Sequence, residues 1–365
     1  MLSFNEIFVD STKYCTKIKT DEYHETGKNI IVDQGQNEIA GYTDLEDGLF
    51  SDVPAIIFGD HTRIIKYVDK PFFIGADGVK VLKSKYEKTN YKYLYYALKN
   101  VKIPNTGYNR HFKWLKEAKI NYPEISKQQK IVSTLDKLQS IITHRRTQLE
   151  KLDLLVKARF VEMFGTYPAN EYGWKIGTIR DLVTEVRYGS SRKASDNNSG
   201  KYPYLRMNNI TYSGKLDLSD TKTIDIPDKE LQKCTVRKGD VLFNRTNSKE
   251  LVGKTCVYNR DEMMVLAGFI IRVRLNEKML PDVLSSFLNT DFSKNMLLEK
   301  CKTAIGQANI NAQEMQNIGI YIPPIELQEK FVTFTKQVDK SRVAVQKELD
   351  KAQMLFDSLM QEYFG

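Results

Sequence analysis

The sequence lacks long apolar runs and is poor in cysteine. No stretch approaches the ~20 apolar residues that a membrane-spanning helix needs, and the amino-terminal MLSFNEIFVDSTKYC has neither the basic start nor the apolar core of a secretion signal. The four cysteines, Cys15, Cys234, Cys256 and Cys301, form no CxxC pair, so we expect reduced, buried thiols rather than disulfides or a zinc site. We therefore expect a cytoplasmic protein with no membrane partner.

The motifs of several enzyme classes are also missing. The sequence has no GxxxxGK[ST] loop and no HExxH site, and its four histidines are not spaced as metal ligands. Its one Pro-Pro pair follows isoleucine, unlike the Asn/Asp-Pro-Pro-aromatic loop of amino-methyltransferases. FFIGADG (72–78) contains FxGxxG but runs into VKVLKS, which alternates like a strand, whereas a cofactor loop of this kind leads into a helix. We expect no catalysis, no metal and no cofactor bound by this chain.

Length and charge set the broad class. A chain of 365 residues suits two domains, since one core rarely serves more than roughly 250–300 residues. The composition, 41% hydrophobic and 28% charged, is that of a globular protein. A net charge of +9 favours a polyanionic partner without choosing among them.

The clearest positive feature is an internal repeat. Residues 123–165 align without a gap with residues 323–365, with eleven identities, and both copies end in Phe-Gly. Upstream, an offset of 190 places YKYLYYALKN (91–100) over PDVLSSFLNT (281–290). A long period that occurs only twice is not a solenoid, which needs three or more short units. We predict a duplicated chain with four segments, at 1–121, 122–165, 166–321 and 322–365.

The second and fourth segments carry helical periodicity. Apolar residues recur at steps of three and four in both, from Ile131 to Met163 and from Phe331 to Tyr363. Proline precedes each stretch and glycine ends it, as expected at helix boundaries. About 38 helical residues make a helix of roughly 57 Å. Because so narrow an apolar stripe needs another helix, each copy is expected to pack against the other.

The first and third segments have the pattern of β-rich α/β domains. Short runs such as VPAIIFGD, RIIKYV, VKVLKS and FIIRVRL alternate with Gly, Asp and Asn turns. One modest helix is expected at 90–99 and one at 281–298. The third segment also carries about ten extra residues between roughly 291 and 306.

Polar side chains that suit DNA collect in the third segment. A basic loop, YGSSRKASDNN (188–198), suits phosphates, and the strand-like KYPYLRMNNI (201–210) would place Tyr204, Arg206 and Asn208 on one face. Arginine recognises guanine edges and asparagine or glutamine recognises adenine, so this mixture suits the major groove. The candidates are Ser190, Ser191, Arg192, Lys193, Tyr204, Arg206, Asn208, Asn209, Asn244, Arg245, Thr246, Asn247, Gln307 and Asn309.

The first segment offers counterparts. FGDHTR (58–63) aligns loosely with LFNRTNS (242–248), and TGYNRHF (106–112) aligns with IGQANIN (305–311). The candidates are His61, Thr62, Arg63, Asn109, Arg110 and His111, with Gln34, Gln36 and Asn37 as weaker ones.

Several of these segments together resemble a known family. IPPIELQEKFV…LMQEYFG, YPEISKQQKIVSTLDKL…QLEKLDLLVKARFVEMFG, YPYLRMNNI, TVRKGDVLFNRTNS and QANINAQEM are similar to the specificity subunit (HsdS) of type I restriction–modification systems. The resemblance implies an α/β fold of two β-rich target-recognition domains joined by two long antiparallel helices that form a coiled coil, in a pseudo-two-fold repeat. The first domain departs from the pattern, because it lacks the lead-in found at GWKIGTIRDLV (173–183).

The resemblance also implies partners and cofactors. Each domain would recognise one half of a bipartite site in double-stranded DNA, and the helices would set the spacer and dock two methyltransferase (HsdM) subunits. Two motor-nuclease (HsdR) subunits are optional further partners. S-adenosylmethionine, and ATP with magnesium, would be bound by those partner subunits. The alternative interpretations are a coiled-coil adaptor that assembles enzymes without recognising bases, and an unrecognised enzyme.

Overall fold

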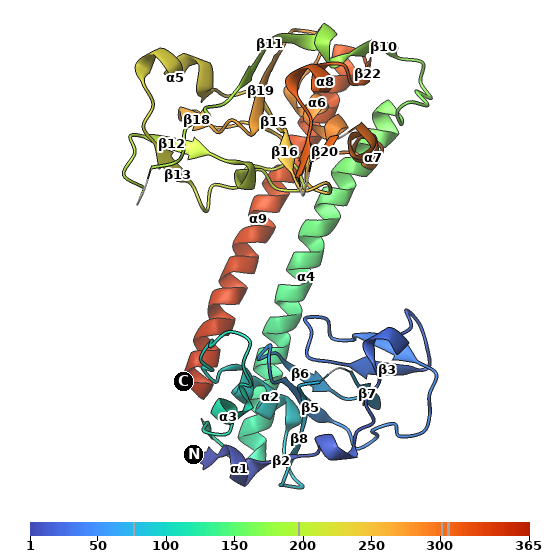
Figure 1. Cartoon of the computed structure of the whole chain (residues 1–365), viewed down its shortest axis with the longest axis vertical. Helices are drawn as coiled ribbons and strands as arrows, with labels where there is room; N and C mark the ends of the chain where they lie inside the picture. Colours follow the sequence, from blue (N-terminus) through green and yellow to red (C-terminus); the bar gives the residue numbers. More distant parts are fainter. Residues whose placement is uncertain (76, 196–197, 301, 305–306) are drawn as a thin grey trace. The chain divides into compact units, whose positions relative to one another are not determined.

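The computed structural model describes residues 1–75, 77–195, 198–300, 302–304 and 307–365 (Figure 1). It divides into two compact units, the first comprising Met1–Arg146 with Lys347–Gly365 and the second comprising Thr147–Gln346. Two 40-residue helices, α4 (Ile125–Phe164) and α9 (Ile325–Phe364), contribute to both units. The four segment limits given above stay a prediction, because this division passes through the long helices rather than around them.

The first unit is built on two small sheets beside short helices. The larger sheet is antiparallel, in the order β2 (Phe8–Asp10), β8 (Val79–Ser84), β5 (Ala55–Gly59) and β6 (Ile65–Val68). The other has the order β4 (Gly41–Thr43), β3 (Asn29–Val32) and β7 (Phe72–Ile74). The remaining elements are β1 (Leu2–Ser3) paired with β9 (Lys119–Ile120), α1 (Phe4–Ile7), α2 (Tyr91–Lys99) and α3 (Phe112–Leu115).

The second unit repeats this plan with additions. Its antiparallel sheet has the order β11 (Val183–Tyr188), β19 (Ile270–Leu275), β15 (Val241–Asn244) and β17 (Thr255–Val257). The second sheet has the order β13 (Lys222–Ile224), β12 (Tyr202–Leu205), β18 (Met264–Leu266) and β14 (Thr235–Val236). The other strands are β10 (Lys175–Thr178) paired with β22 (Gly319–Ile322), and β16 (Thr246–Asn247), β21 (Gln307–Asn309) and β20 (Lys302–Ala304) in one small sheet. The helices are α5 (Asp228–Cys234), α6 (Pro281–Leu288), α7 (Asp291–Lys300) and α8 (Ala312–Gln316).

The two units share one topology. In each, one sheet is antiparallel and the other contains one parallel pair, β3 with β7 in the first unit and β12 with β18 in the second. In each, a strand that immediately precedes a long helix pairs in a two-stranded sheet, as β9 and β22 do. This confirms the expected α/β fold and internal repeat. The single helix expected at 281–298 is wrong in detail, because the chain breaks at Asn289–Thr290 into α6 and α7.

The long helices enter both hydrophobic cores. In the second unit Phe160 and Phe164 of α4 meet Phe331 of α9, with ring centroids 5.4 Å from Phe331 in both cases. In the first unit Leu135 of α4 and Phe356 of α9 belong to one buried cluster. Within the second unit, the contact of Phe160 with Phe331 and the ion pair of Asp153 with Arg342 show that the two helices run antiparallel there. In the first unit Arg146 of α4 donates to Gln353 of α9 at 3.3 Å.

A buried glutamine joins each domain to the start of a long helix. Gln128 accepts a hydrogen bond from the Asn90 backbone N–H (3.0 Å) and donates one to the Pro123 carbonyl (2.9 Å). Gln328 does the same with Leu280 N–H (2.8 Å) and the Pro323 carbonyl (2.8 Å). Both side chains are buried. One side chain thus satisfies a backbone donor at the start of α2 or α6 and a carbonyl just before α4 or α9.

A second pair of residues near the glutamines also has a counterpart in the other unit, but there the positive and negative charges are exchanged. In the first unit Lys92 of α2 binds Asp136 of α4 at 2.6 Å, and the Tyr96 hydroxyl donates to the same carboxylate at 2.7 Å. The matching residues in the second unit are Asp282 of α6 and Lys336 of α9. Burial raises the pKa of Asp282, and the nearby ammonium of Lys336 opposes that rise.

An ionic network crosses the antiparallel sheet of the second unit. Arg272, which is almost completely buried, donates to Glu185 at 3.0 Å. Arg274 donates to Glu185 at 2.6 Å and to the buried Asp240 at 2.8 Å. Burial raises the pKa of Glu185, but its hydrogen bond with Arg187 and the two guanidinium groups outweigh burial and lower the pKa overall. Each charge of this network therefore has an opposite partner.

The cysteines that the structure describes form no disulfide. Cys15, Cys234 and Cys256 are free, and burial raises the pKa of Cys15 and of Cys256 to about 12; Cys301 lies outside the described residues. Among the described residues, no group of three or more His, Cys, Asp or Glu side chains could hold a metal ion. Nor does any helix of the described ranges have the length and apolar character to cross a membrane.

Replacing Gln128 or Gln328 by leucine should lower the free energy of unfolding by about 1–3 kcal/mol, because each change leaves backbone groups without a partner. Urea unfolding of the full chain measures the effect. Gln129→Leu is the matched control, since Gln129 is the exposed neighbour on the same helix and its replacement should change stability by no more than about 0.5 kcal/mol. Equal shifts in Gln128→Leu and Gln129→Leu would contradict the bridging role.

Glu185→Gln should destabilise the chain by about 1.5–3 kcal/mol at pH 7, as expected for a lost hydrogen bond to charged groups. Because the folded pKa of Glu185 is lowered, its contribution is present above its unfolded pKa and is lost as the pH falls through the folded pKa. The wild type should therefore lose more stability than the variant between about pH 5 and pH 3. Glu262→Gln, at an exposed ion pair with Arg260, should leave the pH profile unchanged; identical profiles for Glu185→Gln and wild type would rule this role out.

Candidate nucleic-acid interface

Three segments of the second unit converge around Arg245, directly after the central strand β15. The Arg245 guanidinium donates to Asn309 Oδ1 at 3.1 Å, and its carbon lies 4.8 Å from the centre of the Tyr188 ring. The Arg245 backbone N–H donates to the Phe269 carbonyl at 2.9 Å. Because β16 pairs with β21, Thr246 lies opposite Asn309. The structure therefore brings together residues 188, 245–247 and 309, which are distant in sequence.

The side chains of this cluster differ in their exposure to solvent. Asn309 is exposed, Arg245 and Asn247 are partly exposed, and Thr246 and Asn244 are buried. Asn244 closes the following loop, since its backbone N–H donates to Lys254 O and its carbonyl accepts from Gly253 N–H, both at 2.8 Å. Gln307 begins β21, but its side chain lies outside the described residues. Arg245, Asn247 and Asn309 are thus the side chains of this cluster that reach the surface.

The basic loop of the second unit is tied down internally. The Tyr204 hydroxyl is buried and donates to the carbonyls of Ser190 (3.2 Å) and Arg192 (2.9 Å). The Arg192 guanidinium forms two hydrogen bonds with Glu230, at 2.8 and 3.1 Å. Ser190 is also buried, whereas Ser191 and Lys193 are exposed. The loop therefore presents Ser191 and Lys193 outward, and Tyr204 fixes its backbone.

The strand expected to continue through residue 208 is wrong. β12 ends at Leu205, and a short 3₁₀ helix, Met207–Asn209, follows. The buried Asn209 accepts from the Arg206 N–H at 2.8 Å and donates to the Asp217 carbonyl at 2.8 Å, which turns the chain. Tyr204, Arg206 and Asn208 therefore do not share a strand face. Arg206 binds Asp220 at 2.8 Å, and only Asn208 of this group is fully exposed.

The first unit has an equivalent turn after its central strand β5. The Asp60 carbonyl accepts from the backbone N–H of His111 at 2.8 Å, and the buried His111 ring nitrogen Nδ1 lies 2.9 Å from the same oxygen. Gln34 accepts from the His61 N–H at 3.2 Å, and the Thr62 hydroxyl donates to the Gln34 carbonyl at 2.7 Å. Two distant segments, at Gln34 and at His111, thus hold the turn, and the buried His111 ring supports it from inside.

The outer surface of that turn carries most of the other candidates. Thr62, Asn109, Arg110, Gln36 and Asn37 are exposed, and His61 and Arg63 are partly exposed. The Tyr108 ring stacks on His61, with centroids 4.5 Å apart and planes 7° from parallel, and the tyrosine is 87% exposed. Tyr108 and Tyr188 were missed from sequence, since an isolated tyrosine in a polar loop gives no signal of the residue it stacks on.

The DNA contacts assigned from sequence stay predictions. Six of the candidates are buried and support the surface from beneath rather than lie on it: Tyr204, Asn209, Asn244, Ser190, Thr246 and His111. The exposed and partly exposed side chains are the ones free to make contacts without a rearrangement.

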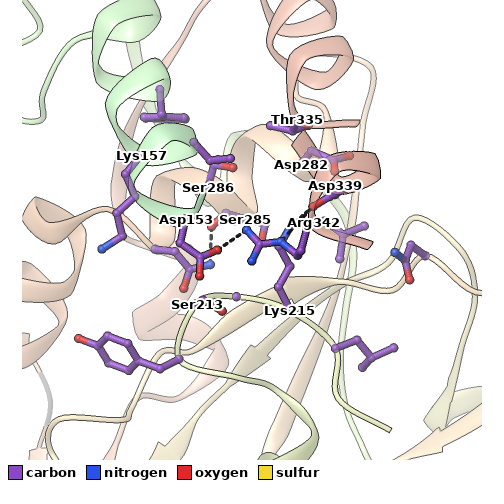
Figure 2. Close-up of a pocket in the computed structure, with 18 of the residues that line it drawn as sticks. Asp153, Lys157, Ser213, Lys215, Asp282, Ser285, Ser286, Thr335, Asp339 and Arg342 are labelled. Atoms are coloured by element: carbon purple, nitrogen blue, oxygen red, sulfur yellow. Dashed lines mark hydrogen bonds and ion pairs between the residues drawn. The ribbon is translucent and has the colours of Figure 1, made fainter. Parts of the chain in front are cut away.

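The second unit also contains a cavity of about 510 Å³, lined by parts of α4, α6 and α9 and by the loop 211–218. Lys215 from that loop binds Asp339 of α9 at 2.7 Å. Figure 2 shows Arg342 of α9 directed between Asp339 and Asp153 of α4, both of which it contacts. The lining mixes carboxylates, cations and serines: Lys215 joins the loop to α9, and Arg342 joins α9 to α4. The cavity therefore does not offer one sign of charge.

Two topologically equivalent units, each with a polar turn after its central strand, define a protein that carries one type of domain twice. The family model described as type I restriction modification DNA specificity domain matches residues 5–152 and 171–352. The chain belongs to this family, which confirms the resemblance seen in the sequence.

Individual relatives agree with this assignment. The chain is 23% identical over 257 residues to the type I restriction enzyme EcoKI specificity subunit of Escherichia coli K12, covering 66% of this chain and 55% of that protein. It is 22% identical to the EcoR124I/EcoR124II specificity subunit of Escherichia coli, covering 90% of this chain and 83% of that one. The match with the first of these relatives thus spans only about half of its length.

A solved structure shares the fold. The type I restriction–modification S subunit from M. genitalium superposes with a TM-score of 0.59 at 16% identity, covering 100% of this chain and 95% of that one.

Proposed function

We propose that this chain is the DNA specificity subunit of a type I restriction–modification complex and that each unit recognises one half of a bipartite site. The observation that carries the proposal is the duplicated polar turn. In both units a partly exposed arginine, Arg63 or Arg245, follows the central strand of the antiparallel sheet. In both, the turn packs beside the segment that leads into a short helix, α3 or α8. Two equivalent sites in one chain would suit a DNA target that consists of two separate half-sites.

The second unit would contribute base contacts from Arg245, Asn247 and Asn309. Arginine forms paired hydrogen bonds with guanine and asparagine with adenine, each worth about 1–3 kcal/mol of discrimination. Tyr188 and Asn309 hold the guanidinium of Arg245 before DNA arrives, which reduces the entropy lost on binding. Lys193 and Ser191 are placed to bind phosphates, a contribution that is independent of sequence.

The first unit would use the turn that begins at Asp60. Thr62, Asn109 and Arg110 supply exposed donors and acceptors, and Arg63 lies partly exposed among them. Tyr108, stacked on His61, presents an aromatic face beside them. His111 would position this turn from inside rather than touch a base.

The remaining subunits would supply the chemistry. This chain would bind two methyltransferase subunits through its long helices, and two motor-nuclease subunits would join them in a restricting complex. S-adenosylmethionine, and ATP with magnesium, would bind to those partners in the cytoplasm. Support comes from the two relatives described above, which are both specificity subunits of type I restriction enzymes.

Arg245→Ala should lower discrimination at one base position of one half-site by about 1–3 kcal/mol and leave the other half-site unchanged. Methylation mapping of DNA modified by the assembled methyltransferase complex measures both half-sites in one experiment. Arg260→Ala removes an exposed cation of the same unit, paired with Glu262, and should leave both half-sites unchanged. A uniform loss across both half-sites after Arg245→Ala would contradict separate recognition by the two units.

A salt titration distinguishes base recognition from a purely assembling role. For the assembled complex, the logarithm of the DNA affinity should fall linearly with the logarithm of the salt concentration, at about −0.9 per neutralised phosphate. Target DNA should remain favoured over other DNA at every salt concentration. An adaptor that never touches bases would show no sequence preference at any ionic strength.

A further inference from the structure

Two buried lysines lie at the base of the second unit's polar loop. We name residues 245–253 the 245–253 loop; it connects β15 to the chain just before β17. Lys294 of α7 is 8% exposed, and its ammonium donates to the Gly253 carbonyl at 2.9 Å. Lys254 is equally buried, and its ammonium donates to the Met207 carbonyl at 3.2 Å. Both ends of the loop are thus fixed where Asn244 pairs with Gly253 and Lys254.

Neither ammonium has a carboxylate partner among the described residues; each meets a neutral carbonyl. Burial, and after it the charges of Lys157 and Lys254, lower the pKa of Lys294 to about 8. The folded chain therefore binds this proton less tightly than the unfolded chain does. By linkage, charged Lys294 reduces stability at pH 7, and this reduction fades as the pH rises from about 8 toward 10.5.

Lys294 lies among apolar and aromatic groups, and its ammonium is 5.8 Å from the centre of the Tyr212 ring. Leu297, one turn further along α7, is buried in the same core as Val252 of the loop. Gly253 has a positive φ of 77°, and a Cβ added there would lie 2.6 Å from Leu297, so α7 packs tightly on the end of the loop. A cation at this position is unfavourable for packing, which points to a specific use for its hydrogen bond.

α7 itself belongs to the additional stretch of the second unit. In the first unit the shorter turn after β5 is held by Gln34 and His111 instead. We infer that Lys294 is a positioning residue: together with the Thr255 hydroxyl, which donates to the same carbonyl at 3.1 Å, it fixes the Gly253 carbonyl and thereby holds the 245–253 loop in the conformation that presents Arg245 and Asn247. This inference rests on the proposed function, and it names a residue on which base discrimination by the second unit depends.

Lys294→Met in the full chain tests it in two ways. First, in the free chain, trypsin should cleave after the exposed Lys249 in the loop at least about fivefold faster than in wild type, while the melting temperature stays equal or rises. Second, in the assembled methyltransferase complex, discrimination at the second unit's half-site should fall about tenfold, with the other half-site unchanged. Lys294→Arg, which keeps a charged donor, should restore part of both.

Lys300→Met is the matched control, because Lys300 is exposed on the same helix; it should change neither readout. Unchanged cleavage and unchanged half-site discrimination in Lys294→Met would overturn the inference. So would a lower melting temperature with equal losses at both half-sites, which indicates a general structural role. A wild-type complex that shows no bipartite target would instead overturn the proposed function, while the cleavage assay would still decide whether Lys294 holds the loop.

Discussion

The architecture depends on one repeated contact, a buried primary amide between a domain and the first turn of a long helix. Helix starts leave backbone groups without partners, and water cannot reach them beneath a packed domain. Gln128 and Gln328 satisfy these groups from both sides at once, accepting from α2 or α6 and donating to the proline carbonyl before α4 or α9. Aspartate and glutamate lack the donor, and leucine lacks both functions. The contact fixes where each domain sits on its own helix start and, with it, where the polar turn is presented.

The two polar turns are held by different means on the same framework. In the first unit, uncharged groups of Gln34 and the imidazole of His111 support a short turn. In the second unit a longer loop is supported by ammonium groups from Lys254 and Lys294. A shared sheet order with different supporting residues allows each turn its own length and side chains. The framework is constant, and the polar turns are free to differ between the units.

The sequence predicted the parts of the fold that are local or repeated. The long helices follow from apolar spacing with proline before and glycine after, and the repeat follows from eleven identities at one offset. Pairing between distant residues could not be predicted. Arg192 meets Glu230, and His111 meets Asp60 across about fifty residues, so neither contact leaves a local pattern. The turn at Arg206 was missed because Asn209 bonds back to the Arg206 backbone, which a strand-like alternation hides. Gln128 and Gln328 align as identical residues in the repeat, but the alignment does not predict which backbone groups they bond.

The reversed charges at the helix starts restrict how the two copies could be recombined. Lys92 faces Asp136 in one unit, and the matching pair in the other is Asp282 and Lys336. A hybrid that joined the first domain to the start of α9 would bring two ammonium groups together, and the reciprocal hybrid would bring two carboxylates together. Like charges at such short range are unfavourable. The exchangeable module is therefore a domain plus the first three turns of its helix, with compatible crossover points beyond residue 136 or residue 336.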